Sequence, residues 1–201
     1  MIKAIIFDLG GVVLDMKPLL DKAVHIFQPS DEDEFWKEIN LEAIPLCKGD
    51  ITIFEFWKRM AKRHKKKISE DILRDLWIKD YRELISINKK VQRIVESLKE
   101  SYKIGMISNI ISEHASINKK LGVFDMYDVV MLSNEVKLTK DKKEIFLLTA
   151  EKLKVLPQEC IFVDDIEKFV NVANSVGMKA ILYKSPSQLQ KELTSLLGKT
   201  G

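Results

Sequence analysis

The segment IKAIIFDLGGV, residues 2–12, runs from a hydrophobic stretch into one carboxylate, Asp8, and then into two glycines. The residues before Asp8 are mostly β-branched or otherwise apolar on both faces, which is typical of a central strand in a parallel sheet. Ligands bind beyond the carboxyl ends of such strands, so Asp8 is directed towards a site. The alternative is an aspartate in a solvated turn, where Asp and Gly are both common. This segment alone leaves both interpretations open.

The composition is that of an ordinary globular chain. Its 201 residues are 46% hydrophobic, and 33 basic side chains nearly balance 30 acidic ones. A chain of this size can bury one full core and carry a small accessory unit. The formal charge of +3 does not indicate a nucleic-acid partner, and the basic run at 62–67 has no aromatic residue for base stacking.

Cysteine usage and hydropathy bear on the compartment. Cys47 and Cys160 lie far apart, without a CxxC or zinc spacing, which favours a reducing environment. No apolar stretch reaches membrane-spanning length, and the N-terminal residues lack the order of a signal peptide. We therefore expect a cytoplasmic protein without a membrane partner, and the sequence leaves its oligomeric state open.

Alternating patterns predict an α/β fold. Five short apolar runs predict strands at residues 2–7, 104–108, 129–133, 160–164 and 180–183. Apolar residues at three- and four-residue spacing predict helices at residues 89–99, 112–121, 142–153 and 167–176. This order indicates a Rossmann-like parallel sheet with right-handed crossovers.

The connection after the first strand has a different character. Residues 16–86 contain no convincing strand but several amphipathic stretches rich in Trp and Phe, at 34–39, 53–63 and 70–84. We expect a small α-helical unit at 16–86, inserted into an α/β core made of residues 1–15 and 87–201.

Polar residues follow the predicted strands at one edge of the sheet. They are Asp8, Ser108 with Asn109, Asp164 with Asp165, and lysines within residues 135–141. Such a set suits phosphoryl chemistry, with a carboxylate nucleophile, a hydroxyl and an ammonium for phosphate oxygens, and carboxylates for Mg²⁺. Each member also has a structural alternative, because Ser and Asn cap helices and surface lysines cluster in solvent. The adjacent aspartates are the hardest to explain without a cation, since they repel each other.

These segments, in this order, resemble the haloacid dehalogenase superfamily of aspartate-dependent hydrolases. The resemblance is carried by FDLGGV at 7–12, MISN at 106–109, Lys140, and FVDD at 162–165 followed by VGM at 176–178. It covers essentially the whole chain and implies a haloacid dehalogenase-like (HAD-like) core, into which residues 16–86 are inserted as an α-helical cap. Within the subgroup, LCKGDIT at 46–52 is similar to small sugar-phosphate phosphatases related to α-glucose-1-phosphate phosphatase.

The resemblance implies roles in catalysis and phosphate binding. Asp8 attacks phosphorus and forms an aspartyl-phosphate, while Lys140 neutralises charge on the transferred group. Ser108 binds a phosphate oxygen, and Asn109 orients the substrate or a loop. Ile145 and Phe146 on the following helix align Lys140 with the family lysine, and Lys137 is the reserve candidate.

The resemblance also implies a Mg²⁺ cofactor. Its ligands are Asp8, the backbone carbonyl of Gly10, Asp165, and Asp164 either directly or through water. The glycines at 10 and 11 let the backbone approach phosphate closely and offer N–H donors.

Three positions depart from the family pattern. Gly10 stands where phosphatases usually carry a second aspartate that protonates the leaving group, a function worth about a hundredfold to ten-thousandfold. Phe169 stands where an Asp or Asn usually supports the metal, and no proline follows Lys140. Asp15 is the nearest acid that could substitute for the missing one, although a hinge or turn role suits it better.

The resemblance therefore predicts a Mg²⁺-dependent phosphatase for a small phosphorylated metabolite, with a sugar phosphate as one candidate. The departures favour, as the alternative, a weakly active or non-catalytic binding protein on the same fold. A 2-haloacid dehalogenase is a third candidate, disfavoured because that branch carries a bulky aromatic residue where Gly10 stands and has little use for adjacent aspartates.

Overall fold

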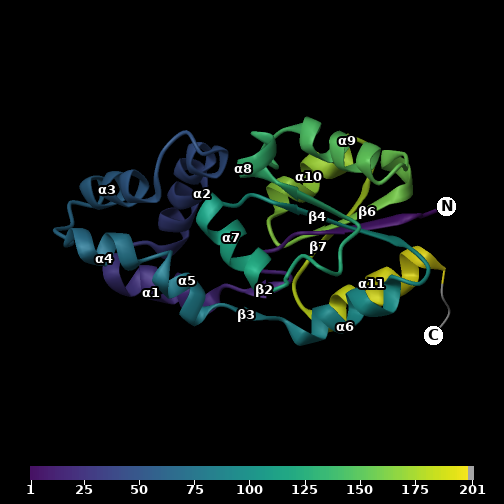
Figure 1. The fold of residues 1–201 in the computed structure, drawn as a ribbon, viewed down its shortest axis with the longest axis horizontal. Coiled ribbons are helices and arrows are strands. Elements are labelled where there is room, and N and C mark those ends of the chain that lie inside the picture. The colour runs from purple at the N-terminus through teal and green to yellow at the C-terminus, as the bar shows by residue number, and fades with distance from the viewer. Residues whose placement is uncertain (199–201) are drawn as a thin grey trace.

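A five-stranded parallel sheet forms the centre of the protein in the computed structural model, which describes residues 1–198 (Figure 1). The strand order is β5-β4-β1-β6-β7, with β1 in the middle. The strands are Ala4–Phe7 (β1), Lys103–Ser108 (β4), Val129–Leu132 (β5), Cys160–Asp164 (β6) and Lys179–Leu182 (β7). The predicted Rossmann-like α/β fold is confirmed.

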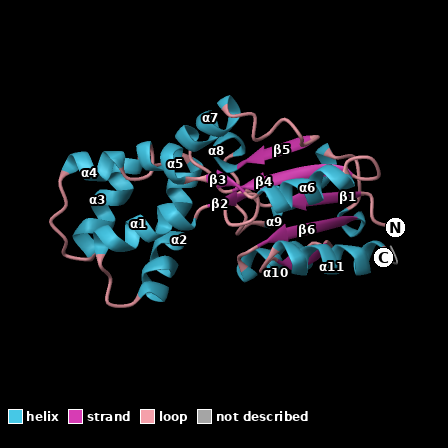
Figure 2. Ribbon diagram, turned by 90° about the horizontal axis from the view of Figure 1, so that it is seen from below, coloured by secondary structure: helices cyan, strands magenta, loops and turns pink. Residues whose placement is uncertain are grey.

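Helices cover both faces of this sheet (Figure 2). Side chains of β1 alternate between the two faces. Ile5 and Phe7 pack in one hydrophobic cluster with residues of α6, α7 and α11, whereas Ala4 and Ile6 pack with residues of α9 and α10. The helices are Lys89–Leu98 (α6), Ser112–Lys120 (α7), Ser133–Val136 (α8), Lys143–Lys152 (α9), Glu167–Ser175 (α10) and Pro186–Leu197 (α11), with a 3₁₀ turn at Pro157–Glu159.

Five helices lie between two short strands that pair antiparallel, β2 (Leu14–Asp15) and β3 (Ser86–Ile87). These helices are Lys17–Phe27 (α1), Glu32–Lys48 (α2), Ile53–Arg63 (α3), Glu70–Asp75 (α4) and Lys79–Leu84 (α5). Local sequence sets their ends. Asp31 accepts the Glu34 N–H at the start of α2, a Thr52–Glu55 capping box starts α3, and Gly49 ends α2 at a φ of 75°.

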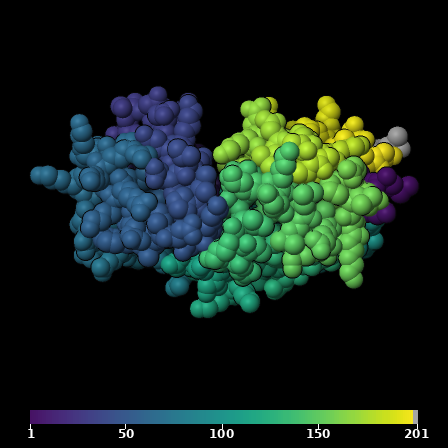
Figure 3. Space-filling model, turned by 90° about the horizontal axis from the view of Figure 1, so that it is seen from above, coloured from purple at the N-terminus to yellow at the C-terminus, as the bar shows by residue number. Residues whose placement is uncertain are grey.

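The five helices share a hydrophobic cluster of their own. Phe27 lies between Phe35 and Trp57, with ring centroids 5.3 Å away in both cases. These rings are buried, and their burial supplies much of the hydrophobic stabilisation of this part. Figure 3 shows this part and the α/β part as two lobes that meet along a seam.

The structure differs from the sequence prediction in its details. The helix expected at 70–84 is two helices, because the chain turns at 76–78, where Trp77 has a φ of 96°. Helices α1 and α11 and the β2–β3 pair were not predicted. The start of α11 does carry a local signal, a capping box between Ser185 and Gln188 with Pro186 at the first helical position. Strand β5 ends at Leu132 rather than 133, since Ser133 begins α8.

Among the helices of residues 1–198, none combines the length and apolar character needed to cross a bilayer. The N-terminus and the end of α11 lie at the end of the α/β part that faces away from the helical insertion (Figures 1 and 2).

Candidate active site

Strand register brings the predicted acids together. Phe7 of β1 pairs with Val163 of β6, so the next residues, Asp8 and Asp164, emerge side by side. The Asp8 N–H donates to the Val163 carbonyl at 2.8 Å, which fixes the first residue after β1 to the neighbouring strand. The carboxyl edge of the central strand therefore carries two adjacent carboxylates.

Three carboxylates form one cluster. Oxygens of Asp8, Asp164 and Asp165 all lie within 4.8 Å of one another. Asp8 and Asp164 are 4% and 0% exposed, whereas Asp165 is exposed. Carboxylate oxygens at this spacing are the ligands that Mg²⁺ prefers, so these side chains are able to hold a divalent cation.

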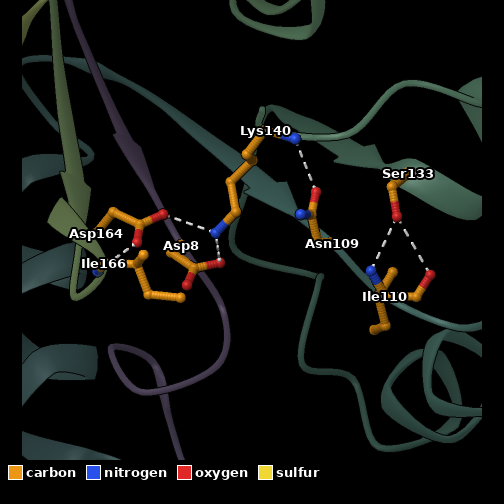
Figure 4. Close-up of polar contacts among 7 residues, drawn as sticks. All are labelled: Asp8, Asn109, Ile110, Ser133, Lys140, Asp164 and Ile166. Carbon is orange, nitrogen blue, oxygen red and sulfur yellow. Dashed lines mark hydrogen bonds and ion pairs between the residues drawn. The ribbon is translucent and has the colours of Figure 1, made fainter. Parts of the chain in front are cut away.

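Lys140 lies against this cluster (Figure 4). Its Nζ is 2.7 Å from Asp8 Oδ1 and donates to Asp164 Oδ2 at 2.6 Å. The Phe169 ring covers the same ammonium, with its centroid 4.7 Å from Nζ. Lys137 instead donates from Nζ to the Lys48 carbonyl at the end of α2. Of the two candidate lysines, Lys140 is the one at the carboxylates.

Burial and charge shift the pKa values in opposite ways. Desolvation raises the pKa of Asp8 well above its usual value, and the attraction of Lys140 only partly offsets this effect. Desolvation, followed by the charge of Asp164, raises the pKa of Asp165 to about 6. Burial alone lowers the pKa of Lys140, but Asp164 and Asp8 outweigh burial and raise it. The site thus stabilises a cation and resists negative charge, as expected where a second, divalent cation binds.

The loop that carries Lys140 is held by hydrogen bonds in place of the absent proline. Asn109 Oδ1 accepts the Lys140 N–H at 2.9 Å (Figure 4). The Thr139 hydroxyl donates to Asp141, and the Lys142 N–H donates to the Thr139 carbonyl at 2.9 Å. Asn109 is thus hydrogen-bonded to the backbone of the loop that carries Lys140.

Of the two glycines after β1, only Gly11 is required by the backbone conformation and its surroundings. Gly11 has a φ of 80°, and a Cβ there would lie 2.1 Å from Asp165 Oδ2, so only glycine allows Asp165 to approach so closely. Gly10 lies outside the left-handed region, and a Cβ there would meet nothing nearer than Met16 Cγ at 3.5 Å. The backbone therefore does not require glycine at residue 10.

The remaining predicted residues lie around this centre. Ser108 is buried at the end of β4 and, with Asn109, lines the cavity above Asp8. Asp15 belongs to β2 and its carboxylate accepts the Lys17 N–H at 3.0 Å. That places Asp15 at the connection between the two lobes.

Sequence reasoning missed Ser133, which lies at the start of α8. Its buried hydroxyl accepts the Ile110 N–H at 2.9 Å (Figure 4). It also donates to the Cys47 carbonyl at 2.8 Å. Ser133 thus joins the loop after β4 to the last turn of α2. The available signal was a serine directly after an apolar strand at the edge where the other candidates lie.

A cavity of about 360 Å³ lies above Asp8, Lys140 and Asp165. Residues of the helical insertion supply most of the rest of its lining. A small molecule in this cavity is enclosed between the carboxylate cluster and the inserted helices, a location common for binding sites.

Comparison with known proteins gives consistent matches. The profile of haloacid dehalogenase-like hydrolases matches residues 2–173. A D-ribitol-5-phosphate phosphatase from Bacteroides thetaiotaomicron is 26% identical over 98% of this chain and 99% of its own length. A phosphorylated carbohydrates phosphatase from Thermotoga maritima is 25% identical over 89% of this chain and 83% of its own.

Solved structures agree with these matches. A HAD family enzyme from Bacteroides thetaiotaomicron, in complex with magnesium and inorganic phosphate, has a TM-score of 0.66 and 26% identity, covering 92% of this chain and 95% of that one. An L-2-haloacid dehalogenase from Xanthobacter autotrophicus has a TM-score of 0.68 and 20% identity, covering 97% of this chain and 83% of its own, and so shares the fold.

Proposed function

This chain belongs to the haloacid dehalogenase-like hydrolase family, and we propose that it is a Mg²⁺-dependent phosphatase that hydrolyses a small phosphorylated metabolite through an aspartyl-phosphate. One observation carries the proposal: three carboxylates within 4.8 Å of one another, with an ammonium 2.7 Å from Asp8, at the floor of a cavity between the two lobes. The phosphatase relatives and the magnesium and phosphate complex of a similar enzyme support it.

Asp8 is the nucleophile in this proposal. One of its carboxylate oxygens forms a bond to phosphorus while the bond from phosphorus to the leaving oxygen breaks. Lys140 lies 2.7 Å from Asp8 Oδ1 and stabilises negative charge on the transferred phosphoryl group. Ser108 and the N–H groups around Gly10 and Gly11 bind phosphate oxygens. Water then attacks phosphorus, which releases inorganic phosphate and regenerates Asp8.

The metal ligands are Asp8, Asp164, Asp165 and the Gly10 carbonyl. Mg²⁺ bound there offsets the repulsion between the carboxylates and an incoming phosphate dianion. The raised pKa values of Asp8 and Asp165 are consistent with this assignment: desolvation raises them first and neighbouring carboxylates add to it, and a bound divalent cation would offset both effects.

Residues 16–86 act as a cap in this proposal. They lie between β2 and β3, and they cover the cavity above Asp8. Such a cap would keep bulk water out while the phosphoryl group is transferred to Asp8, and its side chains would select the leaving group. The names of the two relatives and the segment 46–52 make sugar phosphates one class of ester to include among the small metabolites tested.

The proposal is tested by phosphate release from a panel of phosphate esters and acyl phosphates, with Mg²⁺ or with a chelator. We expect turnover that the chelator abolishes, and a loss of at least a thousandfold in kcat for Asp8→Asn, because covalent catalysis is lost. Folding of the variant is checked by circular dichroism. Turnover that survives in Asp8→Asn contradicts the nucleophile assignment. Halide release from 2-haloacids that resists the chelator favours a dehalogenase.

A further inference from the structure

The cavity has a polar floor and an apolar roof. The floor is made by Asp8, Ser108, Asn109, Lys140 and Asp165, which together account for the phosphate and the metal. The roof belongs to the inserted helices. Its apolar members are Leu20, Trp36, Ile39, Ile44, Phe56 and Trp77.

One face of α2 forms much of this roof. The cavity-lining residues of α2 include Trp36, Ile39, Asn40, Ala43 and Ile44, which recur at the three- and four-residue spacing of a single helix face. Only Asn40 in this set carries an amide, and it is exposed. A leaving group that reaches α2 therefore meets hydrocarbon along most of its length.

The other polar groups of the lining near the roof are those of Tyr81, His114 and Cys47 and the indole N–H groups of Trp36 and Trp77. The Tyr81 hydroxyl accepts from Asn118 Nδ2 at 2.7 Å. His114 Nε2 is hydrogen-bonded to the Trp77 carbonyl, and burial lowers its pKa to about 3, so the ring is neutral. Burial raises the pKa of Cys47 to about 12, which keeps this thiol protonated.

A polyol is poorly matched to this roof. Each hydroxyl that leaves water needs a new hydrogen-bond partner, and a mostly apolar wall offers few for the several hydroxyls of a polyol. A hydrophobic pocket typically discriminates against one added hydroxyl by about a hundredfold. An apolar leaving group of the same length instead gains from contact with the Trp, Ile and Phe side chains.

We propose that this site prefers phosphate monoesters whose leaving group is an apolar alcohol over those of a polyol. The inference rests on the proposed phosphatase function and specifies its substrate class. It departs from the polyol phosphate in the name of the Bacteroides relative, because it follows from the roof residues of this chain.

The test compares pentyl phosphate with D-ribitol 5-phosphate, which have the same five-carbon length and a primary leaving alcohol. We expect kcat/KM to be at least tenfold higher for pentyl phosphate with Mg²⁺. Binding of both esters to Asp8→Asn, measured by calorimetry with Mg²⁺, is expected to show the same preference without turnover. Equal or tighter binding of D-ribitol 5-phosphate overturns the inference.

Two variants connect the preference to the roof. Ile44→Gln places an amide in the roof, and we expect it to reduce the preference about tenfold or more. Leu41→Gln is the control, because Leu41 lies on the same helix but is 63% exposed, and it should leave the preference unchanged. An equal effect of both variants also overturns the inference. If neither ester nor acetyl phosphate is hydrolysed, the proposed function fails, and the binding preference still decides the inference.

Discussion

Gly10 leaves room for an acid beside Asp8, the proposed nucleophile. Its backbone is in a region open to any residue, and Met16 Cγ is the nearest atom to a new Cβ, at 3.5 Å. We predict that Gly10→Asp raises kcat for esters of weakly acidic alcohols by about a hundredfold to ten-thousandfold, because the new carboxyl can protonate the leaving oxygen. Acetyl phosphate, whose leaving group needs less protonation, should change little. Steady-state phosphate release measures both.

Gly10→Asn is the matched control for this prediction. It adds a side chain of the same size that cannot act as a carboxylic acid at neutral pH. We expect no gain in kcat from it. Equal rates in the Asp and Asn variants would show that general acid catalysis is not what residue 10 lacks.

At the scale of single residues, the sequence predicted which residues gather at the site better than it predicted the contacts between them. Asp8, Asp164 and Asp165 were predicted at one edge of the sheet, and the structure brings their oxygens within 4.8 Å. The contact between Phe169 and Lys140 was not predicted. It depends on how α10 packs beside the lysine loop, and spacing along one chain does not contain that information.

At the scale of elements, α8 links the two lobes. Ser133 and Lys137 both donate to carbonyls in the last turn of α2, those of Cys47 and Lys48. These carbonyls have no partner within the helix, so residues outside it satisfy them. The α2–α8 contact thus fixes the roof of the cavity over its floor.

We predict that Ser133→Ala lowers the free energy of unfolding by about 1–3 kcal/mol, because the buried Ile110 N–H loses its acceptor. The three tryptophans of the chain, Trp36, Trp57 and Trp77, all lie in the helical insertion. Their fluorescence during urea unfolding therefore reports on this part.

Ser112→Ala serves as the control for Ser133→Ala. The Ser112 hydroxyl accepts only an exposed hydrogen bond, from Asn134, at 3.3 Å, so we expect a change within about 0.5 kcal/mol. Destabilisation of equal size in the two variants would contradict the importance of the link.

The elements themselves were largely predictable where periodicity was strong. All five sheet strands were placed within two residues, because apolar runs bounded by polar residues mark buried strands. The β2–β3 pair was not, since two-residue strands have no period to detect. The break at Trp77 is fixed by tertiary packing in the insertion and has no Gly or Pro to signal it.

At the scale of the whole molecule, metal binding should stabilise the fold in a pH-dependent way. Mg²⁺ at about a hundred times its Kd stabilises by about 2.7 kcal/mol, which is roughly 5–10 °C in Tm for a chain of this size. Asp165, which faces Asp164, Asp8 and Lys140, has a pKa raised to about 6. Below that pH, Mg²⁺ has to displace a proton, so its affinity falls as the pH falls.

We therefore predict a larger Mg²⁺-induced rise in Tm at pH 7.5 than at pH 5, measured by differential scanning fluorimetry. In Asp165→Asn the side chain at residue 165 no longer titrates, so we expect a smaller Mg²⁺-induced rise in Tm with a weaker pH dependence. The same rise at both pH values in the unmodified protein would exclude Asp165 as a metal ligand that titrates near pH 6.

The central claim is that Asp8 becomes phosphorylated during turnover. The most direct measurement is to quench the reacting enzyme, reduce it with borohydride and identify the modified peptide by mass spectrometry, because borohydride converts an aspartyl-phosphate to homoserine. The account predicts that this conversion occurs at residue 8 and requires both substrate and Mg²⁺. Conversion at another carboxylate, or none at residue 8 while phosphate is released, would contradict it.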